Sequence, residues 1–360
     1  MIMAGGTGGH IYPALAVAKE LHALNIRTVW LGSNHGLENR IVPEQGIKLI
    51  RIFVSGLRGR GWGGWLGAPF VLSIALVQSI FALLNERPGA VLGMGGFASG
   101  PGGIAAWLCR IPLIIHEQNA RAGSTNKILT RFATQVFQAF PQTFDNSRAA
   151  TVGNPVREEI ADLNGNQNRV VSGKDKGESG FNLLILGGSR GARFLNTHLP
   201  PVIMRLQEQR PELKIHVRHQ CGDLELAATQ KLYPRSIDGI EVLPFIEDMA
   251  ANYAWSDIVV CRAGAMTISE LAAAGRASIL VPFPFATDDH QTLNAMYLVE
   301  RGAAKLIPQS DSFETDTFDA LLSLAEEPAQ TQQMAACAQN AAVLDAAQVV
   351  AKRCQELANA

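Results

Sequence analysis

FNLLILGGSRGAR, residues 181–193, repeats a pattern that MIMAGGTGGH, residues 1–10, shows at the start of the chain. Each stretch has a short apolar run, then Gly-Gly, Thr or Ser, one further residue and Gly, and a helical pattern follows. A strand that turns through glycines into a helix opens many nucleotide-binding α/β domains. The repeat therefore predicts two similar domains that face one another, with ligands at the carboxyl ends of their strands.

The rest of the chain supports this α/β prediction. At about 150 residues per domain, the 360 residues have room for two domains, each with its own core. Short β-rich runs alternate with helical stretches, which is typical of parallel sheets. The predicted strands are residues 28–31, 90–92, 113–116, 135–137, 181–188, 214–218, 258–261 and 279–283, and the predicted helices include 12–24 and 195–208. The polar, glycine-rich run at residues 161–180 cannot bury a core, so we place the domain junction there.

Composition excludes several classes of protein. The chain has 31 basic and 32 acidic residues and a net charge of -1, so no overall cationic field attracts nucleic acid. The five cysteines are scattered without a CxxC motif or a Cys/His cluster, which predicts reduced thiols in a cytoplasmic protein and no structural zinc. Neither a charged segment nor a long apolar one precedes the first glycine loop, so we do not expect an export signal.

The uncharged segment WLGAPFVLSIALVQSIFALL, residues 65–84, is long enough to span a membrane, because about 20 residues suffice. Pro69, Ser73 and Gln78 interrupt it, and the strand that follows must pair beside the first strand. We therefore favour a crossover helix over a membrane span. Basic and aromatic residues beside apolar surface suit an anionic bilayer, and they predict membrane docking here. These residues are Arg51, Arg58, Arg60, Trp62 and Trp65.

GGTGGH, residues 5–10, suits a loop that binds a diphosphate. Its glycines let the backbone approach a ligand, and the next helix directs N–H groups and the positive end of its dipole toward negative charge. A dehydrogenase would use the same loop, but it needs an acid for the ribose after the second strand, and none occurs before Glu38. His10 either packs or caps the helix, or it acts as a general base beside the bound anion.

Two further stretches follow later strands of the first half. MGGFASGPGG, residues 94–103, has the glycine density that favours ligand contact, and Pro101 is suited to start a helix. HEQNARAGSTNK, residues 116–127, places polar side chains at a strand end, where a core would need apolar ones. This stretch is either a solvated loop or a source of hydrogen bonds to sugar hydroxyls, through Glu117, Gln118 and Asn119.

The second half contains a matching set. LGGSRGAR, residues 186–193, is a second anion-binding loop and contains Ser189. CRAGAMTISELAAAG, residues 261–275, predicts a strand, a turn and a helix. Thr267 and Glu270 have the spacing of a capping box, so Glu270 either stabilises the helix start only or accepts hydrogen bonds from both hydroxyls of a ribose. In the second case the N–H groups of Ala265 and Met266 bind a diphosphate.

FATDDHQTLNA, residues 285–295, adds two adjacent acids, Asp288 and Asp289. Paired acids suggest a metal, but adjacent carboxylates rarely converge on one ion, and at a helix start they are good caps. We therefore predict no metal and assign this segment hydrogen bonds to a sugar.

Seven motifs, in order and spread over nearly the whole chain, resemble the MurG family of peptidoglycan N-acetylglucosaminyltransferases. They are GGTGGH, MGGFASGP, HEQNARAG, GNPVR, LGGSRGAR, PFIEDM and CRAGAMTISELAAAG with DDHQTLNA after it. The resemblance implies a GT-B fold, in which two facing Rossmann-like domains with parallel sheets enclose an interdomain cleft. It implies an acceptor and membrane-docking domain at 1–158, a UDP-sugar-binding domain at 159–341, and a C-terminal helix, 342–358, that returns to the first domain.

The family's site residues carry over where the motifs match. The resemblance implies that Glu270 binds the ribose, that Ile246 binds the uracil through its backbone, and that Arg157 approaches the donor from the hinge. Either His290 or Gln291 corresponds to the family's sugar-binding glutamine. Further implied substrate-binding residues are Ser189, Ala265, Met266, Thr267, Ile268 and Ser269 on the donor side, and Thr7, Gly8, Gly9 and Asn119 toward the transferred sugar and acceptor. His10 is the candidate base, and Phe97 stands where some relatives carry tyrosine.

The implied reaction is inverting and needs neither metal nor cofactor. It transfers N-acetylglucosamine from UDP-GlcNAc to the 4-hydroxyl of lipid I, undecaprenyl-diphospho-muramoyl-pentapeptide, and forms lipid II. Helix dipoles and Arg157 stabilise the departing diphosphate. The implied partners are UDP-GlcNAc, lipid I, anionic lipids on the cytoplasmic face of the inner membrane, and the cell-wall and division machinery. Another GT-B glycolipid synthase and a non-catalytic UDP-sugar sensor are the alternatives.

Overall fold

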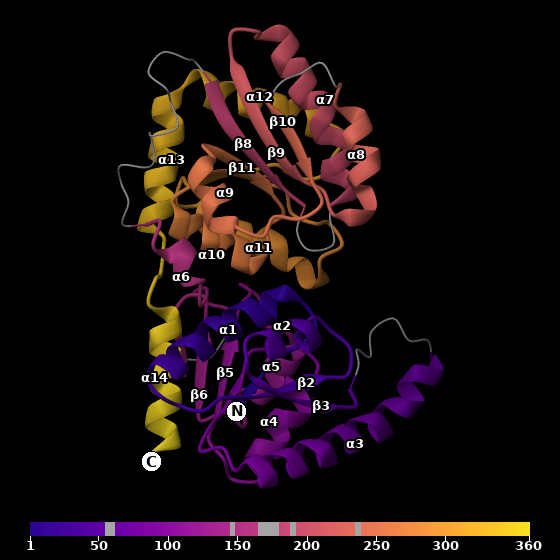
Figure 1. The fold of residues 1–360 in the computed structure, drawn as a ribbon, viewed down its shortest axis with the longest axis vertical. Coiled ribbons are helices and arrows are strands. Elements are labelled where there is room, and N and C mark those ends of the chain that lie inside the picture. Colours follow the sequence, from indigo (N-terminus) through magenta and orange to yellow (C-terminus); the bar gives the residue numbers. More distant parts are fainter. Residues whose placement is uncertain (55–61, 145–147, 165–179, 188–191, 235–238) are drawn as a thin grey trace. The chain divides into compact units, whose positions relative to one another are not determined.

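A computed structural model describes residues 1–54, 62–144, 148–164, 180–187, 192–234 and 239–360, without the side chains of residues 62–68, 180 and 287 (Figure 1). The chain forms two units, Met1–Arg157 with Val343–Ala360 and Glu158–Ala342. The division falls before the polar run that the sequence predicts as the junction. Asn164, at the start of that run, already belongs to the second unit, because its Nδ2 donates to the Ala273 carbonyl.

The first unit is built on a parallel sheet of seven strands in the order β3-β2-β1-β4-β5-β6-β7. The strands are β1 (Ile2–Met3), β2 (Val29–Ser33), β3 (Lys48–Ile52), β4 (Val91–Gly93), β5 (Leu113–Glu117), β6 (Gln135–Gln138) and β7 (Ala149–Thr151). The helices are α1 (Gly8–Ala23), α2 (Glu38–Glu44), α3 (Trp62–Glu86), α4 (Ser99–Leu108), α5 (Ser124–Leu129) and α14 (Ala346–Ala358).

Both faces of this sheet are covered, as the continuous apolar runs of its central strands require. Neighbouring residues of a strand point to opposite faces, so Ile2 packs in a cluster with α1, α2 and α14, whereas Met3 packs in a cluster with α3, α4 and α5. Figure 1 shows α14, in yellow, beside α1. Val350 and Ala351 of α14 are fully buried in the first cluster, so the end of the chain is part of this unit's core.

The second unit repeats this architecture with six parallel strands in the order β10-β9-β8-β11-β12-β13. The strands are β8 (Gly180–Leu186), β9 (Lys214–Gln220), β10 (Ile240–Leu243), β11 (Ile258–Cys261), β12 (Ala277–Leu280) and β13 (Ala304–Leu306). The α-helices are α6 (Glu158–Ala161), α7 (Arg193–Gln209), α8 (Leu226–Leu232), α9 (Met249–Trp255), α10 (Ala265–Ala274), α11 (His290–Val299), α12 (Phe313–Glu326) and α13 (Pro328–Asn340), with 3-10 turns at η2 (Asp223–Glu225) and η3 (Thr287–Asp289).

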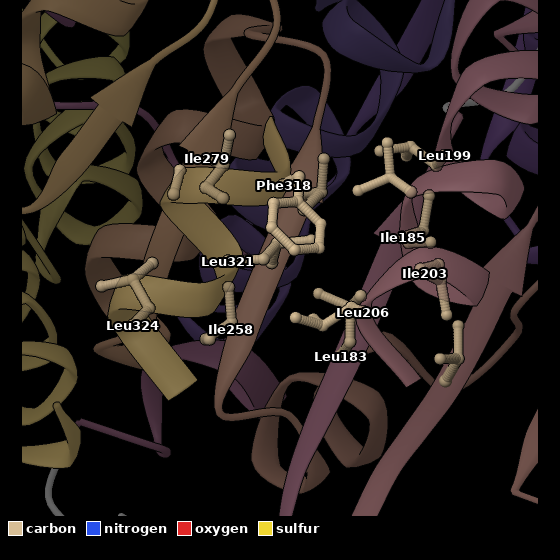
Figure 2. Close-up of a cluster of buried hydrophobic side chains, with 14 of the residues drawn as sticks. Leu183, Ile185, Leu199, Ile203, Leu206, Ile258, Ile279, Phe318, Leu321 and Leu324 are labelled. Carbon is tan, nitrogen blue, oxygen red and sulfur yellow. The ribbon is translucent and has the colours of Figure 1, made fainter. Parts of the chain in front are cut away.

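One apolar cluster joins α7 and α12 to a single face of the second sheet. Leu183 and Ile185 of β8 meet Leu199 and Ile203 of α7, and Phe318 of α12 lies over the neighbouring strands (Figure 2). These side chains are almost completely buried, and each stabilises the fold by about 1.5–3 kcal/mol relative to an exposed position. The packing of α7 and α12 on this face holds the strands of the second sheet, and the candidate site is built after the ends of those strands.

Each sheet has one topological switch point, where the strand order reverses direction. It lies between β1 and β4 in the first unit and between β8 and β11 in the second. Ligands of open α/β sheets bind beyond the carboxyl ends of the strands at this point. The glycine loops of the two units follow β1, β4 and β8, and the loop before α10 follows β11. The strands that precede the two repeated loops, β1 and β8, are therefore the strands at the switch points, although residues 188–191 of the second loop lie outside the described residues.

The long helix α3 connects β3 to β4 of the same sheet, which makes it a crossover helix as the sequence predicts. By length and composition alone its window Pro69–Glu86 could cross a membrane, with a mean hydropathy of 1.6 and 22% of the window buried. Ala75 and Leu83 pack into the core, whereas Phe70 and Phe81 are 73% and 62% exposed. From Pro69 onward, where its side chains are described, α3 thus has one face in the core and one apolar face outward.

Candidate functional site

The first glycine loop is held by a buried carboxylate that the sequence argument considered only as a distant acid. Glu38, at the start of α2, accepts hydrogen bonds from Gly6 N at 3.0 Å and from Ser33 N and Oγ at 3.1 and 2.6 Å. A Cβ at Gly5 or Gly36 would lie 2.6 or 2.1 Å from its carboxylate oxygens, so these glycines make room for it. Glu38 therefore fixes the conformation of the loop, and its carboxylate is fully buried.

The second glycine stretch packs directly on the first. Gly95 and Gly96 follow β4 with φ of +95° and +83°, which favours glycine. A Cβ at Gly96 would lie 2.3 Å from the Gly5 carbonyl oxygen, and one at Gly95 would lie 2.7 Å from His10 Nδ1. The contact explains the glycine density that the sequence analysis assigned to ligand contact, because backbone must approach backbone here.

His10 lies in the first turn of α1, beside this double loop. Thr7 is the N-cap residue, and its side chain makes no capping hydrogen bond. The first N–H groups of an α-helix have no intrahelical acceptor, so those of Gly8 and Gly9 face outward from the helix start. Thr7 and Gly9 are exposed, whereas His10 is half-buried with its Nδ1 3.0 Å from Gln118 Oε1. The structure thus brings the four predicted loop residues to one end of α1.

The HEQN stretch after β5 differs from its expected use. We expected Glu117, Gln118 and Asn119 to offer hydrogen bonds to a sugar, but Glu117 and Gln118 are 3% and 1% exposed. Glu117 accepts hydrogen bonds from Asn119 N and Nδ2 and from Gly123 N, each at 3.1 Å, and from Asn126 Nδ2 at 2.8 Å. Only Asn119 of the three is half-exposed. Glu117 therefore holds the loop, whereas the Gln118 side chain bonds to His10 and His116.

Arg157 is the last residue of the first unit's main segment. Its guanidinium carbon lies 5.4 Å from the centroid of the Tyr12 ring, over the ring face. A cation in this position is attracted by the ring's negative face and is also oriented by it. Because Tyr12 lies in α1 two residues after His10, Arg157 belongs to the same end of α1 as the glycine loop.

In the second unit, Glu270 is oriented by a tyrosine that the sequence analysis did not identify. The hydroxyl of Tyr253, on α9, donates to Glu270 Oε2 at 3.1 Å, and Tyr253 is fully buried. The N-cap residue of α10 is Gly264, so Thr267 and Glu270 do not form the capping box that their spacing permits. Glu270 is 8% exposed and lies in the second turn of α10. Its carboxylate is therefore available for a role other than capping.

The start of α10 lies at the switch point, directly after β11. The N–H of Ile268 donates to the Gly264 carbonyl at 3.0 Å, so it is the first intrahelical donor. Those of Met266 and Thr267 lie before it, where the helix provides no acceptor. The side chain of Ile268 is fully buried, and Ser269 Oγ donates to the Ala265 carbonyl at 3.2 Å. Ile268 and Ser269 therefore stabilise the helix that presents the earlier N–H groups.

The remaining predicted residues of the second unit follow other strands of its sheet. Ile246 is buried in the segment after β10, and Ser189 lies outside the described residues. His290 and Gln291 begin α11 and are both half-exposed. Gln291 Oε1 accepts the Phe283 N–H at 2.9 Å, which leaves its Nε2 to donate. Ile246 follows β10, and His290 and Gln291 follow β12, so these three come after the carboxyl ends of parallel strands, as does α10, which carries Glu270.

The acids before α11 differ from ordinary helix caps. Asp288 and Asp289 both adopt positive φ, 54° and 52°, and Asp289 makes no capping hydrogen bond to the backbone. Its Oδ1 instead accepts a hydrogen bond from Thr292 Oγ1 at 2.7 Å. Throughout the part of the chain that the structure describes, no group of three or more His, Cys, Asp or Glu side chains is placed to hold an ion.

Comparison with known proteins defines the class of this chain. Residues 1–138 match the N-terminal domain of glycosyltransferase family 28, and residues 182–350 match its C-terminal domain. With two parallel-sheet α/β units, the chain is a family 28 glycosyltransferase of the GT-B fold class, which confirms the predicted fold.

Individual relatives narrow the class further. A protein of Chromohalobacter salexigens named UDP-N-acetylglucosamine--N-acetylmuramyl-(pentapeptide) pyrophosphoryl-undecaprenol N-acetylglucosamine transferase is 51% identical over 358 residues, 99% of this chain and 96% of the relative. One of the same name from Alkalilimnicola ehrlichii is 48% identical over 357 residues, 99% of this chain and 98% of the relative. The crystal structure of Acinetobacter baumannii MurG is 40% identical, with a TM-score of 0.82 over 99% of each chain. The chain belongs to the MurG family.

Proposed function

We propose that this chain transfers N-acetylglucosamine from UDP-GlcNAc to the 4-hydroxyl of lipid I and so forms lipid II. The observation that carries this proposal is full-length identity of 51% to a relative named for that transfer. Each unit has a switch point at the carboxyl ends of its strands, where ligands of such sheets bind. Two such places support the proposal, because a donor and an acceptor each need a site. The second unit serves the donor and the first unit the acceptor.

The donor site rests on α10 and its neighbours. A carboxylate accepts two hydrogen bonds well, so Glu270, held by Tyr253, binds both ribose hydroxyls. The N–H groups at the start of α10 and its dipole bind the diphosphate, together with Ser189. Ile246 contacts the uracil. Gln291 Nε2, with its amide oxygen held by Phe283 N, donates to the sugar, and His290 lies next to it.

The acceptor site rests on the first glycine loop. Thr7, Gly8 and Gly9 approach the acceptor and the transferred sugar, as does Asn119, which follows β5 of the same sheet. His10 takes the proton of the muramoyl 4-hydroxyl while that oxygen attacks the anomeric carbon. The bond between this carbon and the phosphate oxygen breaks, and its electron pair leaves with UDP. The dipole of α10 and the Arg157 guanidinium stabilise the negative charge on the diphosphate, which removes the need for a metal.

An acceptor comparison tests the proposal against its alternatives. The protein is incubated with UDP-GlcNAc and, in parallel, a lipid I analogue or diacylglycerol, and products are identified by mass spectrometry. Lipid I should gain one N-acetylhexosamine, and diacylglycerol should not react. A product from diacylglycerol alone identifies another glycolipid synthase, and UDP binding without any product identifies a sensor.

Substitution of Glu270 tests the donor site. Glu270→Ala removes two charge-assisted hydrogen bonds to the ribose and should weaken UDP binding by about 100-fold or more in calorimetry, whereas Glu270→Gln should weaken it less. Glu300→Ala, an exposed carboxylate at the end of α11, is the matched control and should leave UDP binding unchanged. Unchanged UDP affinity in Glu270→Ala would reject the ribose role.

We also propose that the outward apolar face of α3 docks on the cytoplasmic face of the inner membrane. Phe70, Val77, Phe81 and Leu84 of this helix are exposed, and α4, which packs against α3, exposes Trp107. Exposed apolar side chains on one surface mark an interaction site, and nearby exposed cations favour anionic lipid. Arg110, which follows α4, is such a cation. Arg51 is also exposed, but its Nε donates to Asn39 Oδ1 of α2, on the face of the sheet opposite α3. Arg58 and Arg60 lie outside the described residues.

Vesicle flotation tests this docking. The protein should float with vesicles that contain anionic lipid and much less with purely zwitterionic vesicles. Phe81→Glu, which places a charge on the outward face of α3, should reduce flotation. Leu24→Glu, an exposed apolar position at the end of α1, should not. Equal binding to both vesicle types, or no binding, would reject the proposal.

A further inference from the structure

A chain of three hydrogen bonds connects His10 to the backbone carbonyl of Gly153, in the segment after β7. His10 Nδ1 lies 3.0 Å from Gln118 Oε1, Gln118 Nε2 lies 3.3 Å from His116 Nδ1, and His116 Nε2 lies 2.9 Å from the Gly153 carbonyl oxygen. His116 and Gln118 are 0% and 1% exposed, so bulk water does not compete for these bonds. The donor and the acceptor of each bond can be assigned in turn, starting from the end of the chain at Gly153.

The fixed end is the carbonyl of Gly153, which can only accept. His116 Nε2 must therefore carry a hydrogen and donate it. Complete burial lowers the pKa of His116 from 6.5 to about 4, so near neutral pH the ring carries only this one proton. His116 Nδ1 is then an acceptor, and it requires a donor from Gln118.

The amide group of Gln118 supplies that donor. Its Nε2 faces His116 Nδ1 and also lies 3.4 Å from the His116 carbonyl oxygen, which likewise can only accept. Two acceptors on one side of the amide require the NH₂ group there and place Oε1 toward His10. Asn154 Nδ2 donates to the Gln118 carbonyl at 3.1 Å and holds the residue's backbone. The orientation of the amide is thus determined by its neighbours.

We propose that His116 and Gln118 are positioning residues that hold His10 in the tautomer with hydrogen on Nδ1 and a free lone pair on Nε2. Oε1 of Gln118 can only accept, so the neutral His10 ring must place its single hydrogen on Nδ1. Gly95, which packs on the Nδ1 edge of the ring, leaves that edge turned inward. The tautomer follows from the hydrogen bonds alone. Only the role given to Nε2, which takes the proton of the acceptor hydroxyl, rests on the proposed function.

The tautomer can be observed directly in the ligand-free protein. With ¹⁵N-labelled histidine, ring nitrogen shifts at about pH 8.5, where an ordinary imidazole is neutral, distinguish Nδ1–H from Nε2–H. The His10 signals are assigned from their absence in His10→Ala. The wild type should show hydrogen on Nδ1. Hydrogen on Nε2 of His10 in the wild type would overturn the inference.

Variants separate positioning from stability. Gln118→Leu removes the acceptor and should abolish the Nδ1–H preference and lower kcat by about tenfold or more, with UDP binding unchanged. Gln118→Glu keeps an acceptor and should keep Nδ1–H. Gln138→Leu is the matched control: Gln138 is also buried and hydrogen-bonded, to Thr151 and Phe144, and its loss should leave the His10 tautomer as in the wild type.

The outcomes distinguish this inference from the proposed function. An unchanged tautomer in Gln118→Leu would overturn the inference, and if that variant does not fold, the wild-type and Gln118→Glu spectra decide. If the tautomer follows the prediction but His10→Ala keeps full activity, the hydrogen-bond chain stands and the role of His10 as base fails.

Discussion

The hydroxyl of Tyr253 donates a hydrogen bond to Oε2 of Glu270 at 3.1 Å, from a position with no solvent exposure. The bond orients the carboxylate to which we assign the ribose. Tyr253→Phe removes only this hydroxyl and should weaken UDP binding about fivefold, the equivalent of about 1 kcal/mol for one hydrogen bond. Calorimetric titration with UDP measures this, and undiminished affinity would show that Glu270 needs no such support.

His10→Ala should lower kcat by about 100- to 10,000-fold, the usual contribution of a general base, because it removes the group proposed to take the acceptor proton. UDP affinity should stay the same, since the proposed donor site lies in the other unit. His22→Ala, at an exposed position in the last turn of α1, is the control and should keep wild-type kcat. Steady-state assays with lipid I decide, and wild-type turnover in His10→Ala would end the role of His10 as base.

Gly95→Ala should displace the His10 ring and lower kcat by about tenfold or more, because the new Cβ would meet Nδ1 at 2.7 Å in a backbone with φ of +95°. Gly46→Ala controls for the backbone effect alone, since Gly46 has φ of +70° and open space around its Cα. Both variants should lose stability, of order 1 kcal/mol, in thermal unfolding. Equal kcat in the two variants would show that the contact with His10 is unimportant.

The stability of the protein should fall as the pH is lowered from about 6.5 toward 4. Burial lowers the pKa of His116 to about 4 in the folded state, so between these pH values the unfolded chain binds a proton that the folded chain excludes. His116 alone accounts for up to about 3 kcal/mol. His219, whose pKa burial lowers to about 3, acts in the same direction in the second unit. Urea unfolding at several pH values measures the slope, which His116→Gln should reduce. An equal slope in this variant would contradict the assignment.

The pattern of strand, glycine turn and helix was sufficient to predict the two α/β units because it is local in sequence. The predicted strand at residues 258–261 coincides with β11, and those at 113–116 and 135–137 each lack only one residue of β5 and β6. Helix α1 begins at Gly8, four residues before the predicted start, because the first turn tolerates glycines whose N–H groups have no helical acceptor. Strands β3, β7, β10 and β13 were missed, since their mostly exposed or half-exposed residues lack a clear apolar run.

The site was predictable in its motifs but not in its supporting contacts. Glycine loops and the start of α10 follow from local sequence. Glu38 bonds to Gly6, Tyr253 to Glu270, His10 to Gln118 and His116 to Gly153, and the partners in these pairs lie 17 to 108 positions apart. No local pattern predicts such contacts. Conversely, Glu117 and Gln118 had the composition of a sugar-binding site, but both are buried: Glu117 binds its own loop, and Gln118 binds His10 and His116.

The central claim is that this chain forms lipid II by an inverting transfer that needs no metal. The most direct measurement is incubation with UDP-GlcNAc and a lipid I analogue in excess chelator, followed by determination of the product's anomeric configuration by NMR. The account predicts a single β-linked N-acetylglucosamine on the muramoyl 4-hydroxyl, formed at the same rate with and without chelator. Loss of product in chelator, an α-linkage, or hydrolysis of UDP-GlcNAc without transfer would contradict it.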